Sequence, residues 1–323
     1  MTVTFYTSAD TSAPTLNDAQ GALAAVLLAI LVNGYGTQPA AGWTNPQSGT
    51  TGQRVFQQGA GNSNFLNVDD SAGTGTGTYA RVSGYTSMTA FGVGAGQFPN
   101  NIQQSGGLYW PRFQYSSATS PSRWACIATN KTFYFWNEGD GTANGSHNVQ
   151  QLFFFGDMNA YGAHDTSCTV IGGATSGADS SSWTYTGVSA VTGALIIYAA
   201  ANAFGQSGAV VQGFHSDYWL NGASNIMGNG GVAYPNPEDT GLYVKPIWLT
   251  EPIGANNTLR ALMPGIWNCC HAPSNFANTS ITTSQFSGNS GDQVGSSRTF
   301  TVLKLGNTGA TGSVVFETSN TWS

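Results

Sequence analysis

Residues 124–136 read Trp-Ala-Cys-Ile-Ala-Thr-Asn-Lys-Thr-Phe-Tyr-Phe-Trp, two apolar runs separated by a short polar stretch. The second run is almost entirely aromatic, and aromatic and β-branched residues favour extended, pleated backbone. Thr129-Asn130-Lys131 lies between the runs, and Asn is a common turn residue. This stretch therefore predicts a β-hairpin, the basic unit of an antiparallel sheet.

Outside this hairpin, the sequence after residue 42 repeats the same pattern of short apolar or alternating runs between Gly, Asn, Asp, Ser and Pro. Such runs, separated by turns, are typical of antiparallel strands. We expect strands at residues 54–57, 65–68, 79–85, 108–115, 124–129, 132–136, 151–155, 167–171, 195–199, 210–214, 243–249, 299–305 and 312–317. The predicted fold is mainly β: an antiparallel β-sandwich-like body, one large unit or two packed units, with one N-terminal α-helix.

The single predicted helix lies near the start of the sequence. Its apolar residues recur at three- and four-residue spacing, at Leu16, Leu23, Val26, Leu27, Ile30 and Leu31. Asn17 or Asp18 would cap its beginning, and Asn33-Gly34 would end it after about four turns. The other face is small and uncharged, with Ala22, Ala24, Ala25 and Ala29. We therefore expect the helix to be covered on more than one side.

Changes in composition suggest three parts of the chain. Residues 1–44 would form a helical docking segment, residues 45–175 a β-rich domain and residues 176–323 a second β-rich domain. The boundary is placed in the uncharged, Gly- and Ser-rich stretch at residues 172–182. The two β-rich parts could equally form one unit.

Charged residues make up only 7% of the sequence, against roughly 25% in an ordinary soluble domain. Solubility then depends on hydroxyl and amide groups, which excludes coiled coils and salt-bridged helices. The net charge is −6 and no stretch is basic, so we expect neither nucleic acid nor a membrane as partner. No Lys or Arg precedes Arg54 and the apolar run at residues 22–32 is short, so we expect cytoplasmic synthesis without a secretion signal.

Two groups of acidic residues are candidates for chemistry. Asp69-Asp70 begins a Gly-rich turn and could offer oxygen ligands to a hard cation, but Asp before Ser-Ala-Gly ordinarily caps its own turn, which we favour. Asp157, Asp165 and His164, with His147 nearby, suggest a Ser-His-Asp or metal site. Neither a G-x-S-x-G nor an H-E-x-x-H motif accompanies them, so we expect a strand-ending turn at Gly156-Asp157.

Cysteines and aromatic residues offer further candidates. Cys269-Cys270-His271 resembles part of a zinc site but lacks the usual spacing and a fourth ligand, so we expect core packing. Together with Cys126 and Cys168 these cysteines are too few for a disulfide framework, and we expect them reduced. Some aromatic residues could stack on sugars, although a large β core needs the same residues for packing: Trp110, Trp136, Trp183, Trp219 and Tyr218. We therefore predict no catalytic, cofactor-binding or metal-binding residue and no cofactor.

Ten short motifs, in this order along the chain, resemble a family of virion structural proteins of tailed bacteriophages. They are SAPTL at 12–16, LVNGYG at 31–36, AAGWT at 40–44, FLNVDD at 65–70, ARVSGY at 80–85, QFP at 97–99, FFFGD at 153–157, LRALMPG at 259–265, RTF at 298–300 and ETSNTW at 317–322. The resemblance runs from about residue 12 to the C-terminus and rests on the order in which the motifs occur together.

The resemblance implies a non-enzymatic structural component of the virion, present in multiple copies at the capsid surface, neck or tail and baseplate. Its partners would be other virion proteins and copies of itself. Residues 1–44 would dock on the particle, and removing residues 1–40 would leave a folded β body. The alternative is a receptor- or glycan-binding tail protein that contacts a host-surface glycan, with or without glycan-cleaving activity.

Overall fold

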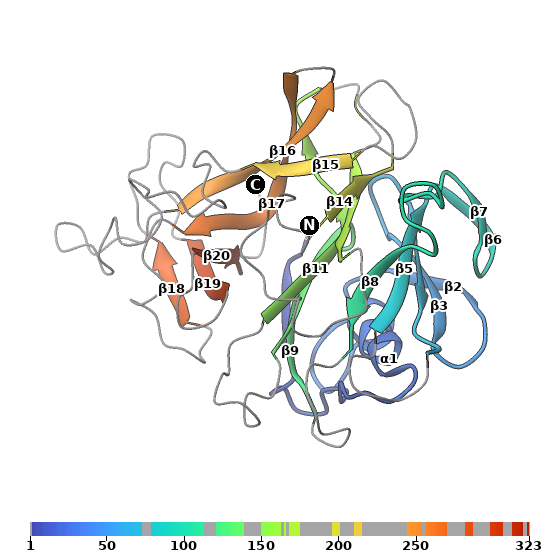
Figure 1. The fold of residues 1–323 in the computed structure, drawn as a ribbon. Coiled ribbons are helices and arrows are strands. Elements are labelled where there is room, and N and C mark those ends of the chain that lie inside the picture. The colour runs from blue at the N-terminus through green and yellow to red at the C-terminus, as the bar shows by residue number, and fades with distance from the viewer. Residues whose placement is uncertain are drawn as a thin grey trace, which may run out of the picture.

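The computed structural model describes residues 2–72, 79–112, 121–138, 150–162, 165, 168–174, 196–200, 210–214, 244–253, 256–269, 282–286, 298–305, 312–318 and 322. Their fold is mainly β, with antiparallel sheets and a single short helix, which confirms the predicted fold class (Figure 1).

A five-stranded antiparallel sheet forms one layer. In spatial order its strands are β2 (Thr44–Ser48), β3 (Gln53–Gln57), β4 (Phe65–Asp69), β5 (Tyr79–Tyr85) and β8 (Leu108–Pro111). Between β5 and β8 the chain forms a separate hairpin of β6 (Ser87–Ala90) and β7 (Val93–Ala95).

A 13-stranded antiparallel sheet contains the other described strands. Its order is β1 (Thr4–Thr7), β9 (Arg123–Ala128), β10 (Thr132–Glu138), β11 (Gln150–Asp157), β13 (Thr169–Gly173), β14 (Ile196–Ala199), β15 (Val210–Phe214), β16 (Val244–Ile253), β17 (Asn256–Cys269), β20 (Gly312–Glu317), β19 (Arg298–Leu305) and β18 (Thr282–Phe286). The short strand β12 (Asn159–Ala160) pairs with β17 beside this path.

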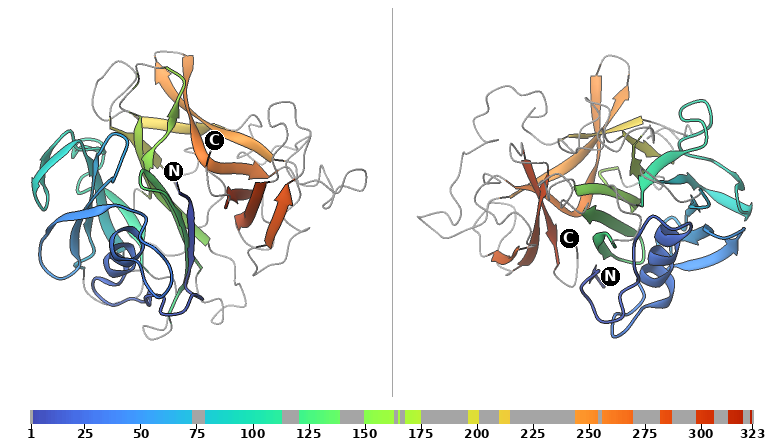
Figure 2. Two further views of the ribbon diagram at one scale, coloured as in Figure 1. Left: turned by 180° about the vertical axis from the view of Figure 1, so that it is seen from behind. Right: turned by 60° about the horizontal axis from the view of Figure 1, so that its bottom comes forward.

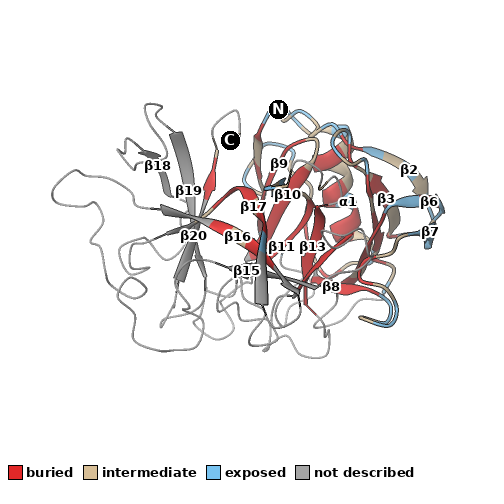
Figure 3. Ribbon diagram, turned by 90° about the horizontal axis from the view of Figure 1, so that it is seen from above, coloured by how far each residue is buried: buried red, intermediate tan, exposed pale blue. Residues whose placement is uncertain are grey.

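The predicted hairpin is β9 and β10, and it lies at the centre of the molecule. Side chains alternate between the two faces of a strand, so Phe133 and Phe135 enter one core while Tyr134 and Trp136 enter the other. Apart from Asp157 at the end of β11, the described side chains of β10 and β11 are buried, and they lie on both faces (Figure 3). This is why the sequence here is a nearly continuous aromatic run and not a strict alternation of apolar and polar residues.

The two cores lie on opposite sides of these central strands. The first lies between them and the five-stranded sheet, and includes Phe56, Leu66 and Trp110. The second is closed by later strands of the same large sheet, with Leu249, Ala261 and Phe316. Figure 2 shows β16 and β17 crossing over the central strands, so the large sheet curls back on itself.

The helix differs from its prediction at its beginning. α1 spans Ala22–Leu28 and continues as a π-helical segment, η1 (Ala29–Asn33). Neither Asn17 nor Asp18 caps it. The N-cap is Gly21, which has a φ of 81° and no side chain to accept a hydrogen bond. The end is as predicted, at Gly34 with φ 74°.

The helix lies inside the chain's own first core. Leu23, Val26, Leu27, Ile30 and Leu31 are all fully buried there, together with the small side chains of Ala22 and Ala24. The expectation that it is covered on more than one side is confirmed. Because its apolar face already contacts this chain, that face is not free to dock on another protein.

The predicted domain boundary falls in a gap between described residues. The last described residue before it is Ala174 and the next is Ile196, and β13 pairs directly with β14 across that interval. A continuous sheet therefore contains strands from both predicted β-rich domains. The division at residues 175 and 176 stays a prediction.

Candidate functional site

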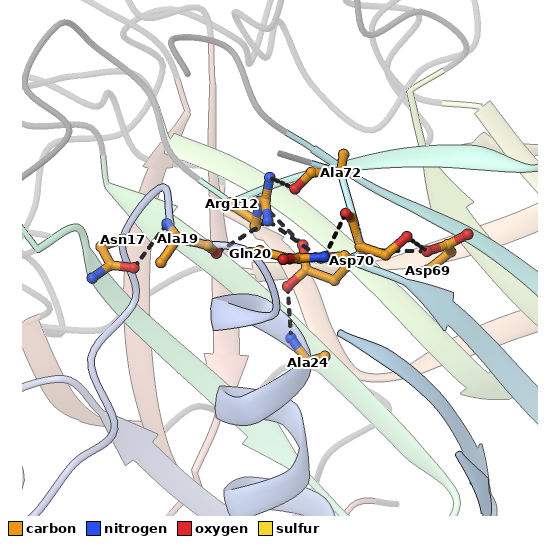
Figure 4. Close-up of polar contacts among 9 residues, drawn as sticks. Asn17, Ala19, Gln20, Ala24, Asp69, Asp70, Ala72 and Arg112 are labelled. Carbon is orange, nitrogen blue, oxygen red and sulfur yellow. Dashed lines mark hydrogen bonds and ion pairs between the residues drawn. The ribbon is translucent and has the colours of Figure 1, made fainter. Parts of the chain in front are cut away.

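Asp70 and Arg112 form an ion pair that is fully buried between the helix and the five-stranded sheet (Figure 4). Asp70 directly follows β4 and Arg112 directly follows β8, and 3.1 Å separates Arg112 Nε from Asp70 Oδ1. The guanidinium also donates to the carbonyl oxygens of Ala19 at 3.0 Å and Ala72 at 3.0 Å. One arginine thus joins the start of the helix to two strand ends.

The same carboxylate serves as the helix cap that sequence analysis assigned to Asn17 or Asp18. Asp70 Oδ2 accepts a hydrogen bond from the Ala24 backbone N–H at 3.1 Å, in the first turn of α1. Burial raises the pKa of Asp70 to about 7, although Arg112 and the helix amides act in the opposite direction. Its oxygens are occupied by internal donors, so its role is structural.

Of the two residues that we expected to cap their own turn, Asp69 does so, whereas the Asp70 carboxylate binds the helix and Arg112 instead. The Asp69 carboxylate accepts hydrogen bonds from the backbone N–H and the hydroxyl of Ser71, two residues later. Asp69 and Asp70 point to different partners and do not converge on one point (Figure 4). Within the described part of the chain, no group of three or more His, Cys, Asp or Glu side chains could hold a metal ion.

Asp157, the last residue of β11, is the centre of a second polar network. Its carboxylate accepts hydrogen bonds from Gln58 Nε2 at 2.9 Å, the Asn62 backbone N–H at 2.8 Å and Thr169 Oγ1 at 2.6 Å. These donors come from the β3–β4 turn and from β13, so the network ties the five-stranded sheet to the large sheet. Each contact of this carboxylate within the described residues is to a neutral donor, and together these contacts cross-link the two sheets.

Asp165 is paired separately with Arg260 of β17. Arg260 Nε lies 2.9 Å from Asp165 Oδ2 and Nη2 lies 3.2 Å from Oδ1, a two-pronged contact between nearly buried side chains. The structure therefore gives Asp157 and Asp165 different partners. His164, His147, Cys270 and His271 lie outside the described residues, whereas Cys126 and Cys168 are buried, in agreement with the expected core packing.

An aromatic pair that sequence analysis did not find lies beside this ion pair. Trp248 of β16 and Asn159 of β12 both pair with Leu262 of β17, from opposite sides, so their side chains share one face. Tyr161, two residues after Asn159, points to the same face, and Trp248 Nε1 donates to its hydroxyl oxygen at 3.0 Å. Leu249 and Ala261 point the other way, into the second core.

This aromatic pair is accessible to solvent. Tyr161 is 53% exposed and Trp248 is half-buried, while Leu259 in the adjoining part of β17 is 47% exposed. By contrast, Trp110 and Trp136 are fully buried, as the core interpretation predicts. Trp183, Trp219 and Tyr218 lie outside the described residues.

A second notable surface lies on the hairpin segment, which we define as residues 84–107. The stretch from 82 to 111 contains no Asp, Glu, Lys, Arg or His. Among the described residues, two of the four large apolar side chains that are exposed lie here: Val93 at 56% and Ile102 at 97%. The hairpin is held over the outer face of the five-stranded sheet, where Met88 packs with Val55 and Tyr85.

Comparisons of the sequence with protein-family models and with curated proteins found no match. In the described part of the chain, no helix has the length and apolar character needed to cross a membrane.

Proposed function

We propose that this chain is a non-enzymatic structural component of a tailed-bacteriophage particle, assembled in multiple copies at the capsid surface, neck or tail and baseplate. Its partners are other virion proteins and copies of itself. The proposal starts from the resemblance of its ordered motifs to such proteins. The observation that supports it best is the uncharged, solvent-exposed hairpin segment.

The hairpin segment has the composition of the centre of a protein interface. Such centres are depleted of charged residues because desolvating an unpaired charge is costly. Val93 and Ile102 offer aliphatic surface, and the surrounding Ser, Thr, Asn and Gln can form neutral hydrogen bonds. Figures 1 and 3 show β6 and β7 at the periphery of the molecule, where a neighbouring subunit can reach them.

The charged groups described above also favour a structural role. Asp70, Asp157 and Asp165 each bind other parts of the same chain, and each cross-links segments distant in sequence. The docking role that we expected of residues 1–44 passes in this proposal to the hairpin segment. The reason is that the helix contacts this chain's own core.

The test is a reconstruction, at side-chain resolution, of particles made by the virus or prophage that encodes the chain. We expect the chain in symmetric copies, with the hairpin segment against a neighbouring subunit. Val93→Asp and Ile102→Asp should abolish incorporation into particles without reducing thermal stability. Thr50→Asp, on an exposed turn elsewhere, is the matched control.

Purified particles that lack the chain would overturn the proposal. Normal incorporation of both hairpin variants would overturn the assignment of the interface to the hairpin segment.

A further inference from the structure

We propose that Tyr161 and Trp248 form a binding platform for an uncharged carbohydrate on the outer face of β16 and β17. This site is separate from the hairpin segment and goes beyond the structural role proposed above. It rests on the exposure of Tyr161, the partial exposure of Trp248, their hydrogen bond and the ion pair that supports them.

The chemistry of the pair combines an apolar ring face with a directed polar group. Trp248 uses its indole N–H, the only donor of its side chain, on the Tyr161 oxygen. The Tyr161 hydroxyl keeps its own hydrogen, which it can donate to a ligand. A pyranose ring presents a C–H-rich face that stacks on an aromatic ring and hydroxyls at its rim that accept hydrogen bonds, so it fits both features.

The segment that carries Tyr161 is fixed in place before any ligand binds. The Tyr161 backbone N–H donates to the Arg260 carbonyl at 3.0 Å, and the Asp165 N–H donates to the Gly162 carbonyl at 2.9 Å. The two-pronged contact of Arg260 with Asp165 closes the same turn onto β17. A ring held in this way loses little conformational entropy on binding.

A β-bulge places Arg260 in this position. Along β16 and β17 the pairing moves from Leu249 with Ala261 to Thr250 with Leu259, which leaves Arg260 as the additional residue. Bulges re-aim side chains and are frequent beside binding sites. Here the additional residue supports the turn of Tyr161.

Charge and size favour a neutral sugar over other ligands. Arg260 and Asp165 neutralise each other beneath the surface, and the whole chain is acidic with a net charge of −6, which disfavours anionic polysaccharides. The platform spans two aromatic side chains, whereas a stable protein interface buries about 800 Å² on each partner. One or two sugar rings match that extent better than a protein surface does.

The test uses the full chain and saturation-transfer NMR with four neutral probes: maltohexaose, cellohexaose, hexa-N-acetylchitohexaose and mannohexaose. We expect at least one to bind with a Kd below about 10 mM. Tyr161→Ala and Trp248→Ala should each weaken that binding about tenfold or more, the loss expected for a stacking ring. Tyr161→Phe keeps the ring and should weaken it only a few-fold.

Val93→Ala, on the distant hairpin segment, is the matched control and should leave sugar binding unchanged. Thermal unfolding of each variant must match that of the parent chain. Failure of all four sugars to bind, equal binding by the parent and both alanine variants, or preference for an anionic probe such as heparin would each overturn the proposal. Val93 belongs to the proposed subunit interface, whereas Tyr161 and Trp248 do not. Sugar binding and particle incorporation therefore test the two proposals separately.

Discussion

At the scale of single residues, Asp70 shows how one side chain can define the start of a helix from a distance. It lies 46 residues beyond Ala24 in sequence, yet it accepts the N–H of the first helical turn and binds Arg112. A carboxylate here is favoured by the partial positive charge of the helix N-terminus. Because the fold supplies this cap from a distant strand end, the residues next to the helix in the sequence do not reveal it.

The buried carboxylate predicts a dependence of stability on pH. Burial raises the pKa of Asp70 from its ordinary value of 3.8 to about 7, so the folded state binds more protons than the unfolded state between these values. The contribution of Asp70 is thus greatest below about pH 4 and falls as the pH rises to about 7, by roughly 1 to 4 kcal/mol. Urea unfolding of the parent chain and of Asp70→Asn between these pH values measures it.

We expect the stability advantage of the parent chain over Asp70→Asn to shrink as the pH rises. Asp69→Asn controls for loss of one acidic residue from the same turn. An advantage that grows with pH would mean that attraction to Arg112 outweighs the cost of burying the carboxylate.

Substitution of a glycine beside Asp157 measures how strongly the polar network around Asp157 constrains the fold. Gly61 has φ 74°, and a Cβ at this position would lie only 2.0 Å from Asp157 Oδ2. Gly61→Ala therefore has the cost of a left-handed backbone, about 1 to 2 kcal/mol, plus displacement of a carboxylate hydrogen-bonded by three residues, about 1 to 3 kcal/mol. Equilibrium unfolding in urea measures the sum.

Gly92 supplies a matched comparison, because it has φ 69° but nothing within 4 Å of an added Cβ. Gly92→Ala should show the backbone cost alone. Equal losses for the two variants would mean that the Asp157 network can move without cost.

At the scale of elements, the local patterns located many of the strands but missed others, among them the long β17, although it pairs with its sequence neighbour β16. The β9–β10 hairpin and the strands β3, β4 and β5 follow their predicted positions closely, and each pairs with a sequence neighbour. β1 and β12 escaped prediction because they are short and pair with β9 and β17, far along the chain. Strands this short contain too few side chains to show the alternation that identifies a strand in sequence.

The Tyr161–Trp248 pair was hidden for the same reason. The two residues lie 87 positions apart, and they meet only because β17 runs between β12 and β16. The bulge at Arg260 also breaks the alternation that would otherwise mark one face of β17. Long-range pairing, which a single sequence does not encode locally, decides this site.

The position of the helix inside the first core predicts the effect of removing it. Deletion of residues 1–40 removes β1 and α1, and exposes apolar side chains such as Phe56 and Leu66 to water. We therefore expect an aggregated or unfolded product, contrary to the sequence-based expectation of a folded β body. Near-ultraviolet circular dichroism and a thermal scan check this.

A milder substitution separates core packing from loss of the whole segment. Leu27→Ala should cost about 2 to 5 kcal/mol because Leu27 is fully buried. Ala25→Ser, at an exposed position of the same helix, should change stability by less than about 0.5 kcal/mol. A soluble, cooperatively folding deletion product would show that the helix is an accessory and not part of the core.

At the scale of the whole molecule, the two cores share the strands that separate them. In β10, Phe135 stacks on Phe153 in the first core, while the next residue, Trp136, stacks on Phe316 in the second, at a ring distance of 4.6 Å. Loss of order in one core must therefore disturb the backbone that forms the other. Of the two arrangements that composition left open, such coupling favours a single folding unit over two β-rich domains.

Calorimetry of the full chain distinguishes these arrangements. We expect one transition, with the calorimetric and van't Hoff enthalpies equal, as for a two-state unit. Phe316→Ala in β20 and Phe56→Ala in β3 lie in different cores, and each should destabilise that same transition by about 3 to 5 kcal/mol. If instead two transitions appear and each variant shifts only one, residues 45–175 and 176–323 are separate domains, and the shared strands do not couple the cores.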